Sequence, residues 1–365
     1  MSTEPTSTQT AVRRAQPDRR PHVICHDNLR NRHVVGALPQ LHEDFRPTPW
    51  LFNGHAQLIF HSLRKNLKRQ KRRAATLYDH HDALTMRDGG CTALLWSGHD
   101  LPATTPTILV LHTITGSPSS MAELVHDLRV ATGWRVVLCL RRGHADLPLL
   151  TPRLNILGCT DDLREQLDVI RTRFPESPLY GVGSSAGSGL LARYLGEAGE
   201  TSPFRAAFAY CPGYDTNIGF DRTQPFYSQM MAKKLVRQFI TPNLDRLAHL
   251  PTAGRLQTAE DLAAFHRELY ELAGYDSYAA YDRASNPMHV FHGIRTPVML
   301  LNAEDDPVCR IGNVEPWLEG MRQMPNVILV TTAEGSHCAH YEGWSARSWS
   351  ARLMAEYFRV MNGLI

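Results

Sequence analysis

The stretch LYGVGSSAGSGLLARYL, residues 179–195, decides how this chain folds. It opens with an apolar run typical of a buried strand and closes with the spacing of an amphipathic helix. Between the two, Gly183 and Gly187 surround Ser185 in a G-x-S-x-G pattern. Small residues on both sides of a serine allow a strained strand-to-helix turn that exposes its hydroxyl. We therefore predict a nucleophile at Ser185; the alternative is a turn that is rich in glycine only for backbone freedom.

Other apolar runs alternate with helical patterns on both sides of this stretch. Strands are predicted at residues 107–111, 134–140, 205–210, 297–301 and 327–330, and helices at 161–173 and 345–361. Apolar strands separated by helices indicate an α/β fold with a mostly parallel central sheet covered by helices on both faces. The alternation stops between about residues 213 and 294. A segment of this length commonly carries function, and we predict that it forms a helical cap inserted over the end of the sheet.

Composition narrows the class of protein. Hydrophobic residues make up 43% of the 365, and 39 basic residues against 36 acidic ones give a net charge of +3. A core is therefore expected, and binding of polyanions over the whole surface is not. Residues 1–40 are polar and without periodicity, which predicts a disordered tail before one body at residues 41–365.

Seven cysteines are scattered and never spaced as C-x-x-C, which favours reduced thiols over a zinc site or disulfides. We expect an intracellular, cytoplasmic protein with no integral membrane segment, because no run of 18 apolar residues occurs. The Ser, Thr and Arg content of the first 20 residues leaves organellar targeting as the alternative.

One local charge run stands out. Ile59, Leu63 and Leu67 recur every four residues and predict a short amphipathic helix. The stretch from Arg64 to Arg73 holds seven basic residues in ten. Such a run is either a weak contact for an anionic surface or a solvated helix face. No specific nucleic-acid partner is predicted.

A serine hydroxyl becomes a nucleophile only when a base takes its proton and an acid orients that base. Two loops that follow the predicted late strands supply both groups. The loop after residues 297–301 offers Asp306 or Asp305, with Glu304 a poorer candidate. The loop after residues 327–330 offers His337 or His340 as the base. The order serine, acid, histidine along the chain is the one that this kind of elbow requires.

An ester or amide carbonyl under attack also needs hydrogen-bond donors for its oxygen. The backbone N–H of Ala186, directly after the nucleophile, is one expected donor. The loop LHTITG at residues 111–116 follows the strand after which such folds place the second donor. Ile114 and Thr113 are the candidates there.

Several short segments together resemble the YheT-like branch of the α/β-hydrolases, which includes the abhydrolase-domain lipases and esterases. They are Pro49-Trp50 with residues 53–57 (NGHAQ), residues 111–117 (LHTITGS), residues 141–144 (RRGH), residues 160–163 (TDDL) and residues 194–197 (YLGE). The resemblance covers about residues 45 to 360.

The resemblance implies which of the candidate residues are the catalytic acid and the base. Its members carry the catalytic acid as the second aspartate of an A-x-D-D-P-like turn, which implies Asp306. They carry the base in a G-G-H-x-G-like turn, which implies His337. Thr113 and Ser188 depart from the branch, because glycine is usual at both positions. The departures put the rate and the substrate range in question.

With the residues above, the resemblance implies a serine hydrolase that cleaves carboxylic esters through an acyl-enzyme, with lipid-like esters as one candidate class of substrate. Nothing in the sequence suggests a metal or an organic cofactor, and none is expected. Two alternatives stay open: an acyltransferase that uses the same triad, and a binding protein that keeps the fold without turnover.

Overall fold

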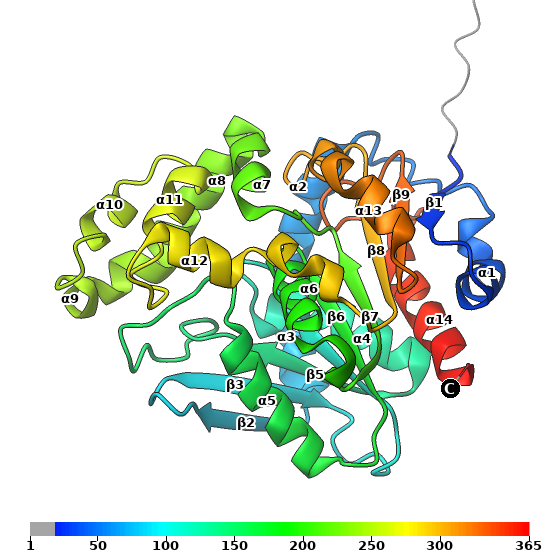
Figure 1. Ribbon diagram of the computed structural model, residues 1–365, viewed down its shortest axis with the longest axis horizontal. Coiled ribbons are helices and arrows are strands. Elements are labelled where there is room, and N and C mark those ends of the chain that lie inside the picture. The colour runs from blue at the N-terminus through cyan, green and yellow to red at the C-terminus, as the bar shows by residue number, and fades with distance from the viewer. Residues whose placement is uncertain (1–18, 365) are drawn as a thin grey trace, which may run out of the picture.

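The structure is a computed structural model that describes residues 19–364 (Figure 1). Its main sheet has nine strands. In spatial order they are β1 (His22–Cys25), β9 (Val327–Thr332), β8 (Val298–Ala303), β7 (Phe204–Tyr210), β6 (Leu179–Ser184), β4 (Thr107–Leu111), β5 (Arg135–Leu140), β3 (Cys91–Ser97) and β2 (His80–Thr85). The strands from β9 to β5 run parallel to one another, and β1, β3 and β2 are antiparallel to their neighbours. The predicted α/β class with a mostly parallel sheet is confirmed.

The central strands are buried on both faces. In β4, Ile108 and Val110 pack into one core cluster and Leu109 and Leu111 into another, and none is more than 1% exposed. This division follows from the two-residue repeat of a strand, and it explains why the strand sequences are continuously apolar.

Helices cover each face of the sheet. One face carries α1 (Leu29–Gly36), α4 (Pro118–Thr132) and α14 (Trp349–Gly363), and the other carries α5 (Thr160–Arg173), α6 (Ala186–Ala198) and α13 (Leu318–Gln323). A small hairpin of β10 (Tyr341–Glu342) and β11 (Arg347–Ser348) precedes α14. In β4 and β6, Leu111 is aligned with Gly183. The loop after β4 therefore begins beside the turn that holds Ser185.

The chain between β7 and β8 is helical. It contains α7 (Thr216–Arg222), α8 (Pro225–Leu235), α9 (Leu244–Leu247), α10 (Ala253–Gln257), α11 (Leu262–Glu268) and α12 (Tyr278–Ser285), and Figure 1 shows α8 to α12 gathered at the upper left. These helices share a core that includes Phe239, Phe265 and Tyr281. Ile114 and Leu157, from the loops after β4 and β5, belong to the same core. The segment therefore packs on loops at the carboxyl end of the sheet.

The predicted tail is too long. His22–Cys25 forms β1, which pairs with β9, with His22 opposite Thr331. Val34, Leu38 and Leu41 are buried in the core under α14. A four-residue edge strand and one short helix are too brief to give a periodic signal, so polar composition masked them. Residues 1–18 of the predicted tail lie outside the described residues.

The predicted helix around Ile59 exists, but the apolar side chains whose spacing predicted it do not form its buried face. The chain forms α2 (Gly54–Lys65) and α3 (Lys68–Leu77), with a break at Asn66. Ile59, Leu63 and Leu67 are 53%, 64% and 51% exposed. The helix contacts the body through other residues, Gln57 and Leu58 among them.

The basic run is also divided. The Arg64 guanidinium pairs with the Glu123 carboxylate on α4. Burial lowers the pKa of Lys65 to about 8. The charges exposed to solvent are therefore those of α3.

Among the helices of residues 19–364, none has both the length and the apolar run that a membrane span needs.

Candidate active site

Ser185 sits at a sharp turn between β6 and α6. Its φ of 51° is rare for a residue with a side chain. The two flanking glycines explain how the backbone can follow this path. A Cβ at Gly183 would lie 2.3 Å from the Gly187 carbonyl oxygen, and a Cβ at Gly187 would lie 2.2 Å from the Leu111 carbonyl oxygen. Any larger residue at either position would clash with backbone, so the spacing of the motif follows from close packing.

His337 faces Ser185 from the loop after β9. Its Nε2 lies 2.8 Å from the Ser185 Oγ, and its Nδ1 lies 2.8 Å from Oδ2 of Asp306. Burial by itself lowers the pKa of His337, but the charge of Asp306 outweighs it, and the pKa is raised well above 6.5. With Nδ1 donating to the carboxylate, Nε2 of the neutral ring is free to accept the serine proton.

Asp306 is fixed by the loop after β8. Its Oδ1 accepts the backbone N–H groups of Val308 at 2.7 Å and Cys309 at 2.9 Å. Its side chain is completely buried. The carboxylate is therefore held in one orientation, with Oδ2 directed at the histidine.

The other acidic candidates lie elsewhere. The Asp305 carboxylate accepts the backbone N–H of Ser336 at 2.7 Å, and burial raises its pKa to about 6. Glu304 is exposed. The structure therefore brings only Asp306 of the three into contact with the imidazole of His337.

His340 belongs to the core behind the site. Its ring nitrogens lie 3.1 Å from the Tyr210 hydroxyl and 3.0 Å from the Thr332 hydroxyl, and the ring stacks on Trp349. Burial lowers its pKa to about 3. The ring is therefore neutral at ordinary pH and has no access to Ser185.

The loop after β4 lies beside Ser185. Ile114, Ala186 and Ser185 line the same cavity, whereas Thr113 lines a second hollow next to Ser184. The structure thus brings Ile114 and Ala186 together with Ser185 and places Thr113 in the other hollow.

Two residues that the sequence left without a role hold this loop in place. The buried Arg141 guanidinium donates to the His112 carbonyl at 2.9 Å and to the Thr113 carbonyl at 2.7 Å. Burial lowers the pKa of Arg141 to about 9. The His144 ring lies 3.0 Å from the Ile114 carbonyl oxygen. Both residues lie in RRGH, residues 141–144. Two arginines and a histidine directly after a buried strand were the sequence signal that could have predicted this role.

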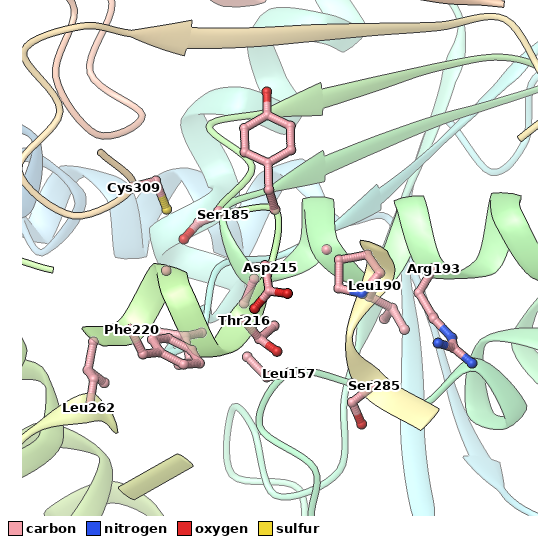
Figure 2. A pocket seen from close by; sticks show the side chains of 18 of the residues that line it. Leu157, Ser185, Leu190, Arg193, Asp215, Thr216, Phe220, Leu262, Ser285 and Cys309 are labelled. Atoms are coloured by element: carbon pink, nitrogen blue, oxygen red, sulfur yellow. The ribbon is translucent and has the colours of Figure 1, made fainter. Parts of the chain in front are cut away.

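A cavity opens in front of Ser185 and extends towards the helical segment between β7 and β8 (Figure 2). The space between its walls, including the part that is open to solvent, is about 850 Å³. Many of its lining side chains are apolar, among them Leu157, Leu190, Phe220, Met231, Leu262 and Val308. Polar groups such as Arg193, Asp215 and Ser285 lie among the other lining residues. The cavity suits a largely apolar ligand.

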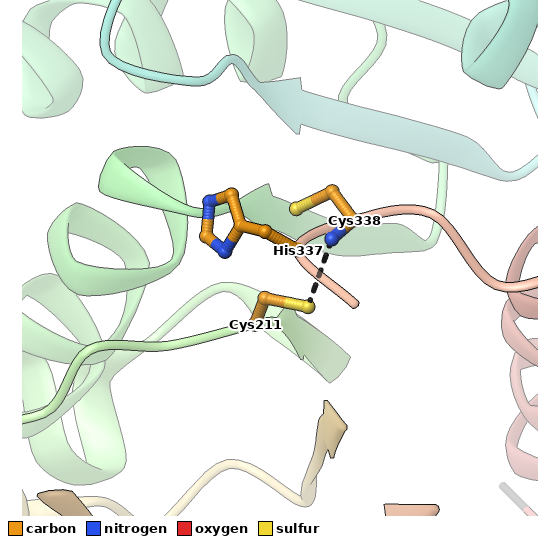
Figure 3. A group of neighbouring side chains, drawn as sticks. All are labelled: Cys211, His337 and Cys338. Carbon is orange, nitrogen blue, oxygen red and sulfur yellow. Dashed lines mark hydrogen bonds between the residues drawn. The ribbon is translucent and has the colours of Figure 1, made fainter. Parts of the chain in front are cut away.

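Three cysteines surround the histidine. The Cys338 N–H donates to the Cys211 sulfur at 3.2 Å (Figure 3). The donor atoms of Cys211, Cys338 and His337 lie within 4.8 Å of one another, as do those of Asp306, Cys309 and His337. Both groups use a histidine whose nitrogens already contact Asp306 and Ser185. A metal ion in either group would therefore compete with the Ser185–His337–Asp306 chain.

Comparison with known proteins identifies the family. The profile described as "alpha/beta hydrolase fold" matches residues 106–343. The chain belongs to the α/β-hydrolase fold family. The resemblance inferred from the short motifs is confirmed at the level of abhydrolase-domain lipases and esterases.

Curated relatives of this α/β hydrolase include proteins with different names. The embryogenesis-associated protein EMB8 of Picea glauca is 27% identical over 91% of this chain and 75% of its own length. Phospholipase ABHD3 of Homo sapiens is 25% identical over 94% of this chain and 85% of its own length. The medium-chain fatty acid ethyl ester synthase/esterase 2 of Saccharomyces cerevisiae is 28% identical over 71% and 63%.

Solved structures support the fold of this α/β hydrolase. A hyperthermophilic esterase of Pyrobaculum calidifontis superposes with a TM-score of 0.55 at 13% identity, over 87% of this chain and 99% of its own. A putative lipase of Acinetobacter baumannii has a TM-score of 0.53 at 14% identity, over 84% and 97%. At these identities the likeness concerns the fold alone.

Proposed function

We propose that this α/β hydrolase cleaves carboxylic esters through an acyl-enzyme on Ser185. The observation that carries the proposal is the chain of two 2.8 Å contacts from Ser185 through His337 to Asp306, next to an apolar cavity. A binding protein needs neither this alignment nor a strained serine backbone.

The mechanism follows from the contacts. His337 takes the Ser185 proton at Nε2 while the oxygen attacks the acyl carbon, and Asp306 stabilises the imidazolium that forms. The carbonyl oxygen becomes an oxyanion, for which we propose the N–H groups of Ala186 and the Ile114 region as donors, with Thr113 the less suitable residue. His337 then protonates the leaving alcohol. Water, deprotonated by the same nitrogen, releases the acid and restores Ser185.

The substrate class follows from the cavity. We propose that the acyl chain lies against Leu157, Leu190 and Phe220, because these side chains offer an apolar wall close to Ser185. The helical segment at about residues 213–294 would act as a cap, since Phe220, Met231 and Leu262 come from it. An ester with an extended hydrocarbon part, such as a lipid, matches these walls.

Acyl transfer is the second candidate. A relative named both synthase and esterase favours it, as does a cavity in which an alcohol can compete with water for the acyl-enzyme. Product analysis of one ester with and without added ethanol separates the two: new ethyl ester at the expense of free acid indicates transfer.

A fluorophosphonate label tests the proposal, because this reagent reacts only with an activated serine. We expect the wild-type protein to be labelled, and Ser185→Ala and His337→Ala to remain unlabelled while circular dichroism shows that they are folded. A folded wild-type protein that resists the label would leave the binding-protein alternative. Label that persists in Ser185→Ala would place the nucleophile on another serine.

A further inference from the structure

Helix α2 turns its apolar stripe away from the body. Ile59 and Leu63, one helical turn apart, are 53% and 64% exposed, and Leu67 follows at 51%. The helix meets the body through Gln57 and Leu58 instead. An amphipathic helix usually buries its apolar side, so a stripe that the described residues leave more than half exposed indicates an external apolar partner.

The exposed apolar side chains continue on to α8. The His55 ring stacks on Tyr227 at 5.7 Å and 7°, and its Nδ1 lies 2.7 Å from the Tyr227 hydroxyl. The Phe226 ring lies against Tyr227 at 5.2 Å. Contacts between rings thus join the outer sides of the two helices. Phe226 is 68% exposed and Met230 48%.

Aromatic residues extend the same surface at the start of α2. Phe52 is 78% exposed. Trp50, which is 42% exposed, packs edge-on against Phe60 and donates its indole N–H to the Trp344 carbonyl. We call the set Trp50, Phe52, Ile59, Leu63, Leu67, Phe226 and Met230 the α2 surface.

The chain segments that form the α2 surface carry basic but no acidic side chains. Residues 45–78 and residues 222–244 contain no Asp and no Glu. On α3, Lys68, Arg69, Lys71 and Arg72 are exposed and form no ion pair with any described residue. Lys233 and Arg237, at the end of α8 and just beyond it, are exposed as well. The partner of this surface is therefore expected to carry negative charge.

We propose that the α2 surface docks the protein on a phospholipid bilayer with anionic headgroups. Large apolar side chains enter the headgroup region while neighbouring Lys and Arg attract the lipid charge, which is how interfacial helices bind. A second copy of the chain fits less well, because a symmetric contact through this surface would bring two basic α3 helices together.

The position of the surface fits a lipid-facing role. Met230 is exposed on α8, and the next residue, Met231, lines the cavity that contains Ser185. Leu58, Tyr227 and Val308 fill the space between α2 and the cavity wall. An apolar molecule in the bilayer would thus lie next to the wall of the cavity. Docking itself does not depend on the proposed hydrolysis.

Cosedimentation with sucrose-loaded vesicles tests the docking. The full-length protein is used with Ser185→Ala, so that no lipid is consumed. We expect it to sediment with phosphatidylcholine vesicles containing about 30 mol % phosphatidylglycerol, more weakly with pure phosphatidylcholine, and less as salt rises. The triple variant Ile59→Ser, Leu63→Ser, Phe226→Ser should lower the partition coefficient by at least about tenfold.

Two further variants control the experiment. Changing Lys68, Arg69, Lys71 and Arg72 to Gln should remove most of the salt dependence. Leu29→Ser with Val130→Ser replaces exposed apolar residues at 83% and 69% on other helices and should leave binding unchanged. Each variant is checked by thermal unfolding, because surface changes should leave stability within about 0.5 kcal/mol.

Three results would overturn docking on a bilayer. The first is absence of the parent protein from the anionic vesicle pellet. The second is an equal loss of binding in the control variant. The third is a dimer, seen by light scattering, that the triple variant dissociates without a change in vesicle binding. The activity of the wild-type protein, which keeps Ser185, is measured separately on a short soluble ester. Absence of that activity together with normal sedimentation would refute the proposed hydrolase function and leave the docking proposal intact.

Discussion

The loops after β8 and β9 each hold two candidate residues of the same chemistry, and in each loop only one of them faces Ser185. Asp306 and His337 contact each other at 2.8 Å in front of the nucleophile. Asp305 instead holds the Ser336 N–H, and His340 lies between Tyr210 and Thr332 in the core. The comparison teaches that residue type and position after a strand identify the loops that hold the candidates. Which side of its loop a residue occupies then decides whether it contacts the site or the core.

Substitution of each histidine by alanine gives the largest expected difference in activity. His337→Ala removes the base, and we expect kcat on a soluble ester to fall by about 10⁶-fold, as when a triad histidine is removed from a serine protease. His340→Ala should keep the activity of each folded molecule within about tenfold, because the ring has no contact with Ser185. Activity is normalised to folded protein. A larger loss in His340→Ala would reverse the assignment.

The two aspartates should differ by a smaller but still large factor. Asp306→Asn removes the carboxylate that orients and charges His337, and we expect kcat to fall by about 10⁴-fold. Asp305→Asn keeps an oxygen for the Ser336 N–H, so the loss should stay below about tenfold. Steady-state kinetics on the same ester measures both. Equal losses would mean that Asp305 acts on the base as well.

Much of this arrangement could be predicted, because its signals are local. The G-x-S-x-G spacing follows from backbone contacts of Gly183 and Gly187 inside one strand–turn–helix unit. Strand-end loops could be found because central parallel strands are continuously apolar. The choice of Asp306 and His337 came only from the resemblance, since spacing cannot tell which side of a loop a residue occupies.

Features that depend on distant neighbours were missed. The period of Ile59 and Leu63 predicted a helix correctly, but the covered side depends on what lies next to α2, and a sequence pattern carries no such information. β1 is a strand because β9 offers it an edge some 300 residues away. The support of the loop after β4 by Arg141 and His144 likewise depends on β4 and β5 lying side by side in the sheet, although α4 separates them in the chain.

The histidines should also differ in their effect on stability. His340→Ala removes two polar contacts and the stacking on Trp349, and we expect the free energy of unfolding to fall by about 3 kcal/mol. Urea unfolding at neutral pH measures this change. A near-neutral result would show that the core behind the site tolerates an empty space, and would weaken the distinction between the two residues.

Asp305 should make the stability of the protein depend on pH. Its pKa is raised to about 6, so the folded state favours the protonated form. The contribution is complete below the unfolded pKa near 4 and is lost as pH rises through about 6. We expect wild type to lose about 2 kcal/mol relative to Asp305→Asn between about pH 4 and 7, after allowance for partial exposure. Urea unfolding of both proteins at the two pH values measures the difference. A constant difference would contradict the burial of this carboxyl.

The pH profile of activity gives the smallest expected effect, and it tests which of the two aspartates sets the charge of His337. The base must be neutral, so kcat/KM should rise with pH and reach half its plateau above 6.5, because Asp306 raises the pKa of His337. In Asp306→Asn the remaining activity should have its midpoint at lower pH, since burial then acts without the opposing charge. At about pH 6, which is below this midpoint, the wild-type rate should therefore lie below half of its plateau. Asp305→Asn serves as the matched control, because Asp305 has no contact with the imidazole and its own titration would shift the profile only through the Ser336 N–H. A midpoint that moves in Asp305→Asn but not in Asp306→Asn would show that the aspartate behind the loop, and not the one in front of it, sets the charge of the base.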